Sequence, residues 1–502
     1  MLASALSLSD HAVRILSALV ISPLLIQGLG VESYGLWLLV LSFIGYLEFL
    51  DLGLANTTVR FFSITIEGKD AELLSPLFYR IRRHYRMVGL GIMAISLVGA
   101  LIINTRLSSP NRSAGALLFL VLGLAQGLAF QLRVYPALLK AHLRYTGITL
   151  ASTLRVALFT LAIFWFRRYQ LTLYTLLSVH VFLILTEQLV LFLAARHLVP
   201  KRTDRNLAPD TQKQLVSYAS KIVVASAAGF FRERIDTQLL AAYVSLSAVT
   251  QYAVGMRFPG LFLDLSNSVF GGHLMSAFGI KSSRNEGDDV SDSLLSVLRV
   301  SSSFAIIGGV GLFFLGPPFI DRWLGPGFGG SADILRITVP GMMLIVLQYP
   351  VFTFLAAINR YGRVVSASLI GSLVNFVASF ILVQWIGLTG VVWATGCENV
   401  LYSAIVLPCL AAPLLGMSAL RMAVTTILLP MLRLCLPLGL LTWLYCSHFH
   451  PATYLEIIVA GIAISLAGFA LSWIWVLKQA EQQFIIAQMA RILQSLGVPL
   501  LS

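Results

Sequence analysis

The sequence predicts an all-α polytopic membrane protein, and three observations carry this prediction. Of its 502 residues, 58% are hydrophobic and only 11% are charged, whereas a soluble domain carries about 25% charged residues. The mean hydropathy is +0.85. Apolar runs of about 20 residues, long enough to cross a bilayer core as a helix, recur along the whole chain.

Arginine, lysine, glycine and proline interrupt the apolar runs and divide them into separate predicted spans. The first of these has no basic segment before it and no credible cleavage site, so we expect it to be a retained helix rather than a signal peptide. The fourteen predicted spans are 10–29, 35–58, 87–104, 115–138, 146–166, 171–195, 215–243, 249–278, 294–317, 334–357, 364–385, 388–412, 424–446 and 453–477.

Basic residues are distributed unevenly over the connections between the spans. Alternate connections carry 20 Arg and Lys residues on one side and 6 on the other. The positive-inside rule therefore predicts cytoplasmic N- and C-termini. The same asymmetry explains most of the net charge of +13, so we predict no nucleic-acid partner. In the basic connection between the second and third spans, Leu73–Arg86 reads as a short helix lying on the membrane surface.

An internal repeat divides the chain. LKAHLRYTGITLAS at Leu139–Ser152 and LAAINRYGRVVSAS at Leu355–Ser368 share six residue identities at an offset of 216. Tyr34 and Tyr252, each at the start of a span, agree at an offset of 218. Two copies of a six-helix unit enter the membrane in the same sense, which predicts a pseudo-two-fold axis along the membrane normal and a central cleft between two lobes.

The repeat divides the chain into four predicted segments. The first and third are the two six-helix lobes, the second is a polar cytoplasmic linker, and the fourth holds two additional spans with a cytoplasmic tail. Their predicted boundaries are 1–196, 197–214, 215–412 and 413–502.

Charged residues within the spans are the main indication of a site. Each costs roughly 2.5–3.5 kcal/mol at mid-membrane, so it requires a partner, a watery cavity or a function. The richest cluster is Arg232-Glu233-Arg234-Ile235-Asp236, where Arg232 and Asp236 share a helix face. For that pair, a self-neutralised structural ion pair is an equal alternative. Arg234 points away from it and has no such local partner.

Other spans add further charges. Arg257 and Asp264 lie two turns apart on one face of the eighth span, and Glu48 and Asp51 are neighbours in the second. The first span adds Arg14. Four further charges, taken singly, fit structural interhelical ion pairs better than a binding role: Arg155, Glu187, Arg299 and Glu398. Snorkelling towards the cytoplasmic surface is enough to account for Arg14 and Arg299.

Fixed guanidinium groups in a cleft suit phosphate or pyrophosphate, to which Arg presents paired donors. Buried carboxylates suit a proton-coupled carrier. The chain lacks a GxxxxGK[ST] phosphate loop and a Cys/His cluster with metal-ligand spacing, so we expect no ATP drive, no metal and no cofactor. Its external connections are too short to hold an active site, which disfavours an enzyme.

One stretch of the second span carries a resemblance to a known family. Glu32–Phe62 begins with Tyr34-Gly35, continues as an aromatic-rich run into Asp51-Leu52-Gly53-Leu54, and has Arg60 shortly after. This pattern resembles the polysaccharide transporters, the O-antigen flippase type of the multidrug/oligosaccharidyl-lipid/polysaccharide exporter superfamily. The Arg-Tyr turns at Arg144 and Arg360 and the segment Phe319–Ile337 fit the same resemblance.

The resemblance implies an alternating-access flippase that carries a polyprenyl-pyrophosphate-linked oligosaccharide to the outer leaflet of a bacterial inner membrane. Its product would serve O-antigen, capsule or exopolysaccharide biosynthesis, with membrane lipids and other polysaccharide-assembly proteins as partners. Expected substrate-binding residues are Arg234, Arg257, Arg232, Arg14 and Arg155. Expected residues for proton coupling or for the field of the cavity are Asp51, Glu48, Asp264, Asp236 and Glu398.

Three other functions remain open. A cation-coupled multidrug exporter of the same superfamily would favour a cavity of carboxylates and aromatic rings. A polysaccharide polymerase or ligase would need larger external loops. A structural role in a polysaccharide-assembly complex leaves the buried arginines unexplained.

Overall fold

The computed structural model of the chain describes residues 2–68, 73–106, 111–203, 235–271, 274–275, 277–278, 287–358, 360–483 and 485–487. Helices dominate these residues and no strand occurs among them. Ten of the helical segments described are long and apolar enough to cross a bilayer, and Val13–Leu29 and Val31–Leu47 are shorter apolar helices. The all-α polytopic fold predicted from the sequence is confirmed.

The chain forms two compact units, Met1–Thr250 and Gln251–Ser502. The predicted linker falls within the first unit, and its residues 204–214 lie outside the described part of the chain. Helices of the first unit are α1 Leu2–Leu29, α2 Val31–Glu67, α3 Leu74–Arg106, α4 Arg112–Leu132, α5 Val134–Ala141, α6 Tyr145–Phe166, α7 Leu173–Ala195 and, crossing the boundary, α9 Leu246–Gly255. Residues 235–243, the described part of the predicted span 215–243, are also helical.

The second unit contains the remaining helices. They are α10 Arg257–Phe270, α12 Gly287–Leu324, α13 Gly329–Ala357, α14 Tyr361–Ile386, α15 Leu388–Leu401, α16 Leu407–Ala411, α17 Ala419–Ala423, α18 Leu436–Phe449 and α19 Tyr454–Trp475. π-helical turns lie at Tyr402–Val406, Val424–Leu428 and Met431–Cys435, where they join shorter helices into continuous helical runs.

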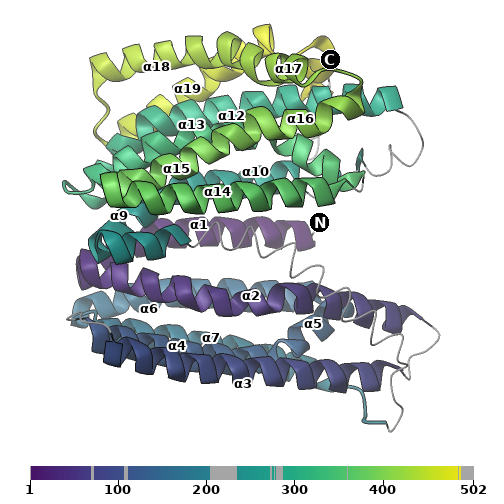
Figure 1. Ribbon diagram of the computed structural model, residues 1–502, viewed down its shortest axis with the longest axis vertical. Coiled ribbons are helices and arrows are strands. Elements are labelled where there is room, and N and C mark those ends of the chain that lie inside the picture. The colour runs from purple at the N-terminus through teal and green to yellow at the C-terminus, as the bar shows by residue number, and fades with distance from the viewer. Residues whose placement is uncertain are drawn as a thin grey trace. The chain divides into compact units, whose positions relative to one another are not determined.

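In the first unit, α3 packs along α4, and α4 in turn contacts α2 and α7 (Figure 1). Small residues permit the approach of α3 to α4: a Cβ atom added to Gly89 would lie 2.5 Å from the Gly127 carbonyl oxygen. Since lipid tails are as apolar as the helices, close backbone approach is what drives helix association in a membrane. The helix α4 is thus the buried centre of this unit.

In the second unit, α13 is the most buried span and contacts α12 and α15 (Figure 1). The helix α15 also packs on α14, and α12 contacts α19. The helix α19 buries Ile457, Ala460 and Ile464 in one core cluster with Ile306 and Leu347. The two spans predicted after the second lobe are therefore integrated into the core of this unit.

The repeated sequence motif forms the same turn in both units. In the first, the Arg144 N–H donates to the Leu139 carbonyl at 2.9 Å, and α6 begins at Tyr145. In the second, the Arg360 N–H donates to the Leu355 carbonyl at 2.9 Å. The helix α14 begins at Tyr361, 216 residues after Tyr145. The sequence repeat is therefore a repeat of local structure.

One local prediction is wrong. The segment Leu73–Arg86 does not form a separate surface helix, because α3 runs without a break from Leu74 to Arg106. Buried Leu77, Ile81 and Tyr85 alternate with exposed arginines at helical spacing, so this stretch is an amphipathic first part of α3.

Candidate functional site

A charge pair lies near the middle of two neighbouring helices of the first unit. The Arg155 Nε atom, from α6, is 2.8 Å from the Glu187 Oε2 atom, from α7. The exposed fractions of the two side chains are 27% and 14%. Each residue therefore supplies the partner that a charge at this depth requires, and neither has to face lipid alone.

A cavity of about 380 Å³ lies beside this pair. Residues of α2, α4, α6 and α7 line it, together with the single residue that joins α4 to α5. Beyond the ion pair, its polar lining consists of Gln126, Arg133, His180 and Gln188. The remaining lining is aliphatic. Two guanidinium groups, one carboxylate, one imidazole and two amides thus converge on one space within the first unit.

Aromatic rings hold His180 in place. Its ring centroid lies 5.3 Å from the ring of Trp37 in α2, at an interplanar angle of 89°. It lies 5.5 Å from the ring of Phe159 in α6, at 75°. Edge-to-face contacts of this kind fix ring orientation. The helices α2, α6 and α7 therefore all contribute to the position of the imidazole.

Gln188 gives the cavity an unused hydrogen-bond acceptor. Its Oε1 atom is buried and has no hydrogen-bond partner among the described residues. An unsatisfied buried polar atom costs about 1–3 kcal/mol. The site can therefore stabilise a polar group that donates to Gln188, while Arg155 and Glu187 offer charges of both signs.

Arg14 lies apart from this cavity, on α1. Its Nε atom is 2.8 Å from the Asp10 Oδ2 atom, and its Nη2 atom donates to the Ser152 hydroxyl of α6. Asp10 also accepts a hydrogen bond of 2.6 Å from Thr153. Arg14 is thus part of a polar contact between α1 and α6.

Arg257 and Asp264 both lie on α10 in the second unit, as the sequence predicted for one helix face. The structure adds a break at Met256, which separates α9 from α10. Pro259 explains it, since proline has no N–H to donate to the carbonyl four residues earlier, at Gly255. Met256 keeps helical backbone angles and its carbonyl accepts from the Gly260 N–H at 2.9 Å, so Arg257 is the first residue after a one-residue interruption of a single span.

Two of the predicted carboxylates are buried. Asp236 is 2% exposed, and Glu398, on α15, is 6% exposed. Gly371 of α14 makes room for Glu398, because a Cβ atom there would lie 2.7 Å from the Glu398 Oε1 atom. Both carboxylates are enclosed by protein rather than exposed to lipid.

The other predicted residues cannot be assigned contacts. Glu48 and Asp51 lie within α2, but the structure does not describe their side chains. Arg232 and Arg234 lie outside the described residues. Among the predicted substrate-binding and proton-coupling residues whose side chains the structure describes, Arg155 lines the cavity of the first unit.

Sequence reasoning did not single out His180, Gln126, Gln188, Arg133 or Asp10. Uncharged polar residues are common in spans, so His180 and the two glutamines carry little signal alone. A signal existed in the spacing of α7, where His180 and Glu187 are seven residues apart and therefore share a helix face. Gln126 of α4 also lines this cavity. Its presence could not be predicted from spacing, because it depends on the packing of α4 against α7.

The described helices define a class, the polytopic all-α membrane proteins, and two solved transport proteins share the fold. The chain has a TM-score of 0.71 and 15% identity to the structure of the lipid II flippase MurJ in an inward closed conformation, covering 93% of this chain and 98% of that one. It has a TM-score of 0.66 and 13% identity to an inward-facing multidrug resistance MATE family transporter of the MOP superfamily, covering 80% and 94%.

Within this class, the chain belongs to the polysaccharide biosynthesis protein family, whose model matches residues 28–333, more than half of the sequence. It is also 21% identical to the uncharacterized membrane protein EpsK of Bacillus subtilis (strain 168), over 93% of each chain. The family resemblance predicted from the second span is confirmed.

Proposed function

We propose that this protein is a flippase that moves a polyprenyl-pyrophosphate-linked oligosaccharide from the cytoplasmic to the outer leaflet of a bacterial inner membrane by alternating access. The oligosaccharide would serve O-antigen, capsule or exopolysaccharide synthesis. Both termini are proposed to be cytoplasmic, as the distribution of basic residues indicates.

One observation carries this proposal: a chain of the polysaccharide biosynthesis protein family has, over 93% of its length, the fold of a lipid II flippase. A family concerned with polysaccharide synthesis and a fold found in a lipid-linked-precursor flippase together favour a lipid-linked sugar as cargo. Such a cargo carries a pyrophosphate, for which arginine is the most suitable binding residue.

The proposed roles follow the charges within the spans. Arg257 and Arg234 are the first choices for binding the pyrophosphate, with Arg232 as a further choice. Arg14 and Arg155 are engaged with Asp10 and Glu187, so binding by them requires an exchange of partners. Proton coupling, or setting the field of the cavity, is proposed for Asp51, Glu48, Asp264, Asp236 and Glu398.

Accumulation of the substrate in cells tests this function. Cells in which the protein is depleted should accumulate lipid-linked oligosaccharide that an outer-leaflet glycan-modifying enzyme cannot reach, measured by mass spectrometry of extracted lipids. Wild-type protein should restore access. Accumulated lipid-linked oligosaccharide that the outer-leaflet enzyme can reach would instead indicate a role after translocation, and contradict the proposal.

A cation-coupled multidrug exporter is the alternative, and one observation favours it: MATE transporters share the fold. A polar cavity lined by Glu187 and by His180, whose ring contacts Trp37 and Phe159, is compatible with an organic cation. Efflux of cationic dyes from cells expressing the protein, abolished by a proton or sodium ionophore, would support this alternative. Unchanged dye efflux would leave the flippase as the better account.

A further inference from the structure

A strongly basic pocket of about 370 Å³ lies in the second unit, and none of its lining residues is among those proposed above for transport. The helix α12, the helical run from Ala419 to Cys435 and the end of α19 form its walls. Four of its lining residues are cationic: Arg299, Arg421, Arg433 and Lys478. None of the lining residues recorded for this described region is acidic. The pocket therefore has a clear positive charge.

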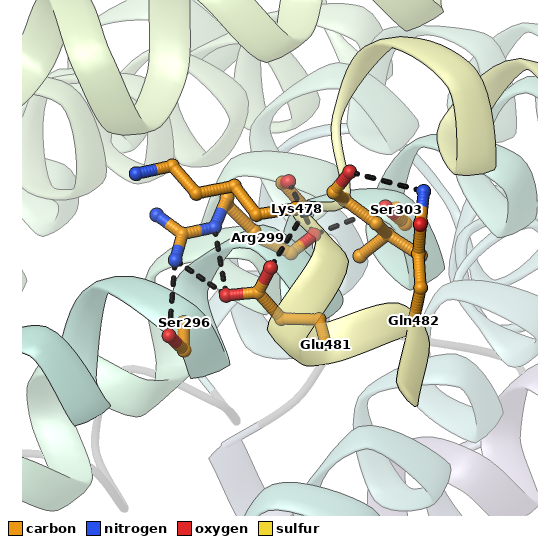
Figure 2. Close-up of polar contacts among 8 residues, drawn as sticks. Ser296, Arg299, Ser303, Lys478, Glu481 and Gln482 are labelled. Atoms are coloured by element: carbon orange, nitrogen blue, oxygen red, sulfur yellow. Dashed lines mark hydrogen bonds and ion pairs between the residues drawn. The ribbon is translucent and has the colours of Figure 1, made fainter. Parts of the chain in front are cut away.

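One of the four cations is already neutralised. Figure 2 shows the guanidinium of Arg299, from α12, beside the carboxylate of Glu481, which follows α19. Arg299 Nε donates to Glu481 Oε1 at 3.1 Å, and Nη2 donates both to the same oxygen and to the Ser296 hydroxyl. The exposed fractions of the two side chains are 22% and 5%. Glu481 and Ser296 thus hold the Arg299 guanidinium in place at the wall of the pocket.

The Glu481 carboxylate also fixes the backbone of Lys478, another residue that lines the pocket. Glu481 Oε2 accepts a hydrogen bond of 2.7 Å from the backbone N–H of Lys478. Nearby, the Gln482 amide donates to the Trp473 carbonyl at 2.6 Å (Figure 2). The chain after α19 is therefore fastened to the helix end, and Lys478 is held at the pocket while its side chain remains exposed.

The π-helical turn at Val424–Leu428 brings two arginines to one side. Arg421 and Arg433 are 12 residues apart, which in a regular α-helix places them about 120° apart around the axis. A π turn contains one extra residue, which reduces the angle between the two arginines around the helix axis to about 20°. Both side chains are exposed and line the same pocket, and Arg433 Nη1 donates to the Trp475 carbonyl at 3.4 Å.

We propose that this pocket binds the phosphate headgroup of an anionic membrane phospholipid. Arg421, Arg433 and Lys478 would contact the phosphate, to which arginine presents paired donors. Ile474 and Trp475, both exposed at the pocket, would contact the start of the acyl chains. Basic pockets between spans are where anionic headgroups bind membrane proteins. The inference does not depend on the proposed function.

Native mass spectrometry of the purified full-length protein tests the proposal. The probes are phosphatidylglycerol, zwitterionic phosphatidylcholine and polyprenyl pyrophosphate, each added to delipidated protein. Wild type should retain phosphatidylglycerol at least tenfold better than phosphatidylcholine. The double variant Arg421→Gln/Arg433→Gln should lose at least tenfold of that affinity, because the loss of even one charge-assisted contact of about 1.5 kcal/mol corresponds to about tenfold.

Two controls separate binding from folding. Arg336→Gln removes an exposed arginine of α13 that does not line this pocket and should retain wild-type affinity. Arg421→Lys/Arg433→Lys keeps the charge and should restore most of the binding. Equal phosphatidylglycerol affinity in wild type and the Gln double variant would overturn the proposal. A preference for polyprenyl pyrophosphate that the double variant abolishes would also overturn it, since the pocket would then be a substrate site.

Discussion

The Arg155 guanidinium of α6 and the Glu187 carboxylate of α7 form an ion pair of 2.8 Å near the middle of their helices. The pair borders a cavity that also contains His180 and Gln188. A charge of either sign at this depth is costly when alone. The two residues consequently depend on each other, and any ligand of the cavity has to compete with this pairing.

The first prediction concerns that mutual dependence. Arg155→Ala or Glu187→Ala should each lower the free energy of unfolding by about 1–3 kcal/mol, because each leaves a partly buried charge without its partner. The double variant Arg155→Ala/Glu187→Ala should cost less than the sum, with a coupling of about 0.5–3 kcal/mol. Thermal unfolding in detergent measures all three. Additive losses would contradict a direct interaction.

The exposed pair Arg336 and Asp333 provides the matched control. Their closest approach is 3.8 Å, and their side chains are 51% and 63% exposed. Exposed pairs contribute about 0–1 kcal/mol. Arg336→Ala should therefore leave the unfolding temperature almost unchanged.

The second prediction concerns Gly35 in the Tyr-Gly pair of the second span. A Cβ atom at Gly35 would lie 2.0 Å from the backbone oxygen of Leu246 in α9, and backbone cannot move aside cheaply. Gly35→Ala should thus strongly reduce folded protein in the membrane. Gly91→Ala, in α3, meets nothing within 4 Å and should be neutral or slightly stabilising. Fluorescence-detected size-exclusion chromatography compares the two, and equal yields would argue against the close approach of α2 and α9.

The third prediction concerns pH and Glu481. Burial alone raises the pKa of this carboxyl, but hydrogen bonds from Arg299 and Ser296, the charge of Arg299 and the Lys478 N–H outweigh it and hold the pKa below its usual value of 4.5. A carboxyl with a lowered folded-state pKa stabilises the protein above about pH 4.5, and this contribution is lost as the pH falls through the folded-state pKa.

Glu481→Gln should accordingly have a lower unfolding temperature than wild type at pH 7. This difference in unfolding temperature should become smaller below pH 4.5. Glu67→Gln, at an exposed side chain at the end of α2, should follow wild type at both pH values. Melting curves across pH 3.5–7 provide the measurement. A constant difference between Glu481→Gln and wild type over this range would be inconsistent with ionisation as the cause.

The fourth prediction concerns Arg257 at the start of α10. If it binds pyrophosphate, Arg257→Gln should reduce translocation roughly tenfold or more, the equivalent of one charge-assisted hydrogen bond. Protein abundance in the membrane should change much less. Arg336→Gln serves again as the control. Parallel losses of abundance and transport in Arg257→Gln would assign this residue a structural role.

Hydropathy was sufficient to predict most of the fold. Most described helices overlap a predicted span, because each must satisfy its own backbone hydrogen bonds in lipid and its composition is therefore set locally. The ends agree less well: α3 begins at Leu74 rather than at 87, and the span 115–138 divides into α4 and α5. The repeat was also readable, since Arg144 and Arg360 form the same turn from the same local sequence. The arginines of Leu73–Arg86 indicate a membrane-surface helix, and so the sequence does not predict that α3 is continuous.

The sites were harder to predict because they depend on packing between helices. The sequence favours an ion pair or snorkelling for Arg299 of α12, but nothing in the local sequence indicates that its partner is Glu481, beyond the last span. The convergence of His180 and Gln126 likewise requires α7 to pack on α4. The π turn at Val424–Leu428, which aligns Arg421 with Arg433, has no simple sequence signature.

Reconstitution tests the central claim most directly. Purified protein in vesicles loaded on the inner leaflet with a polyprenyl-pyrophosphate-linked oligosaccharide should make that lipid accessible to an externally added glycan-processing enzyme, faster than in protein-free vesicles and faster than with Arg257→Gln. Folded wild-type protein that gives the protein-free rate with its cognate oligosaccharide would contradict the claim that this chain is a flippase.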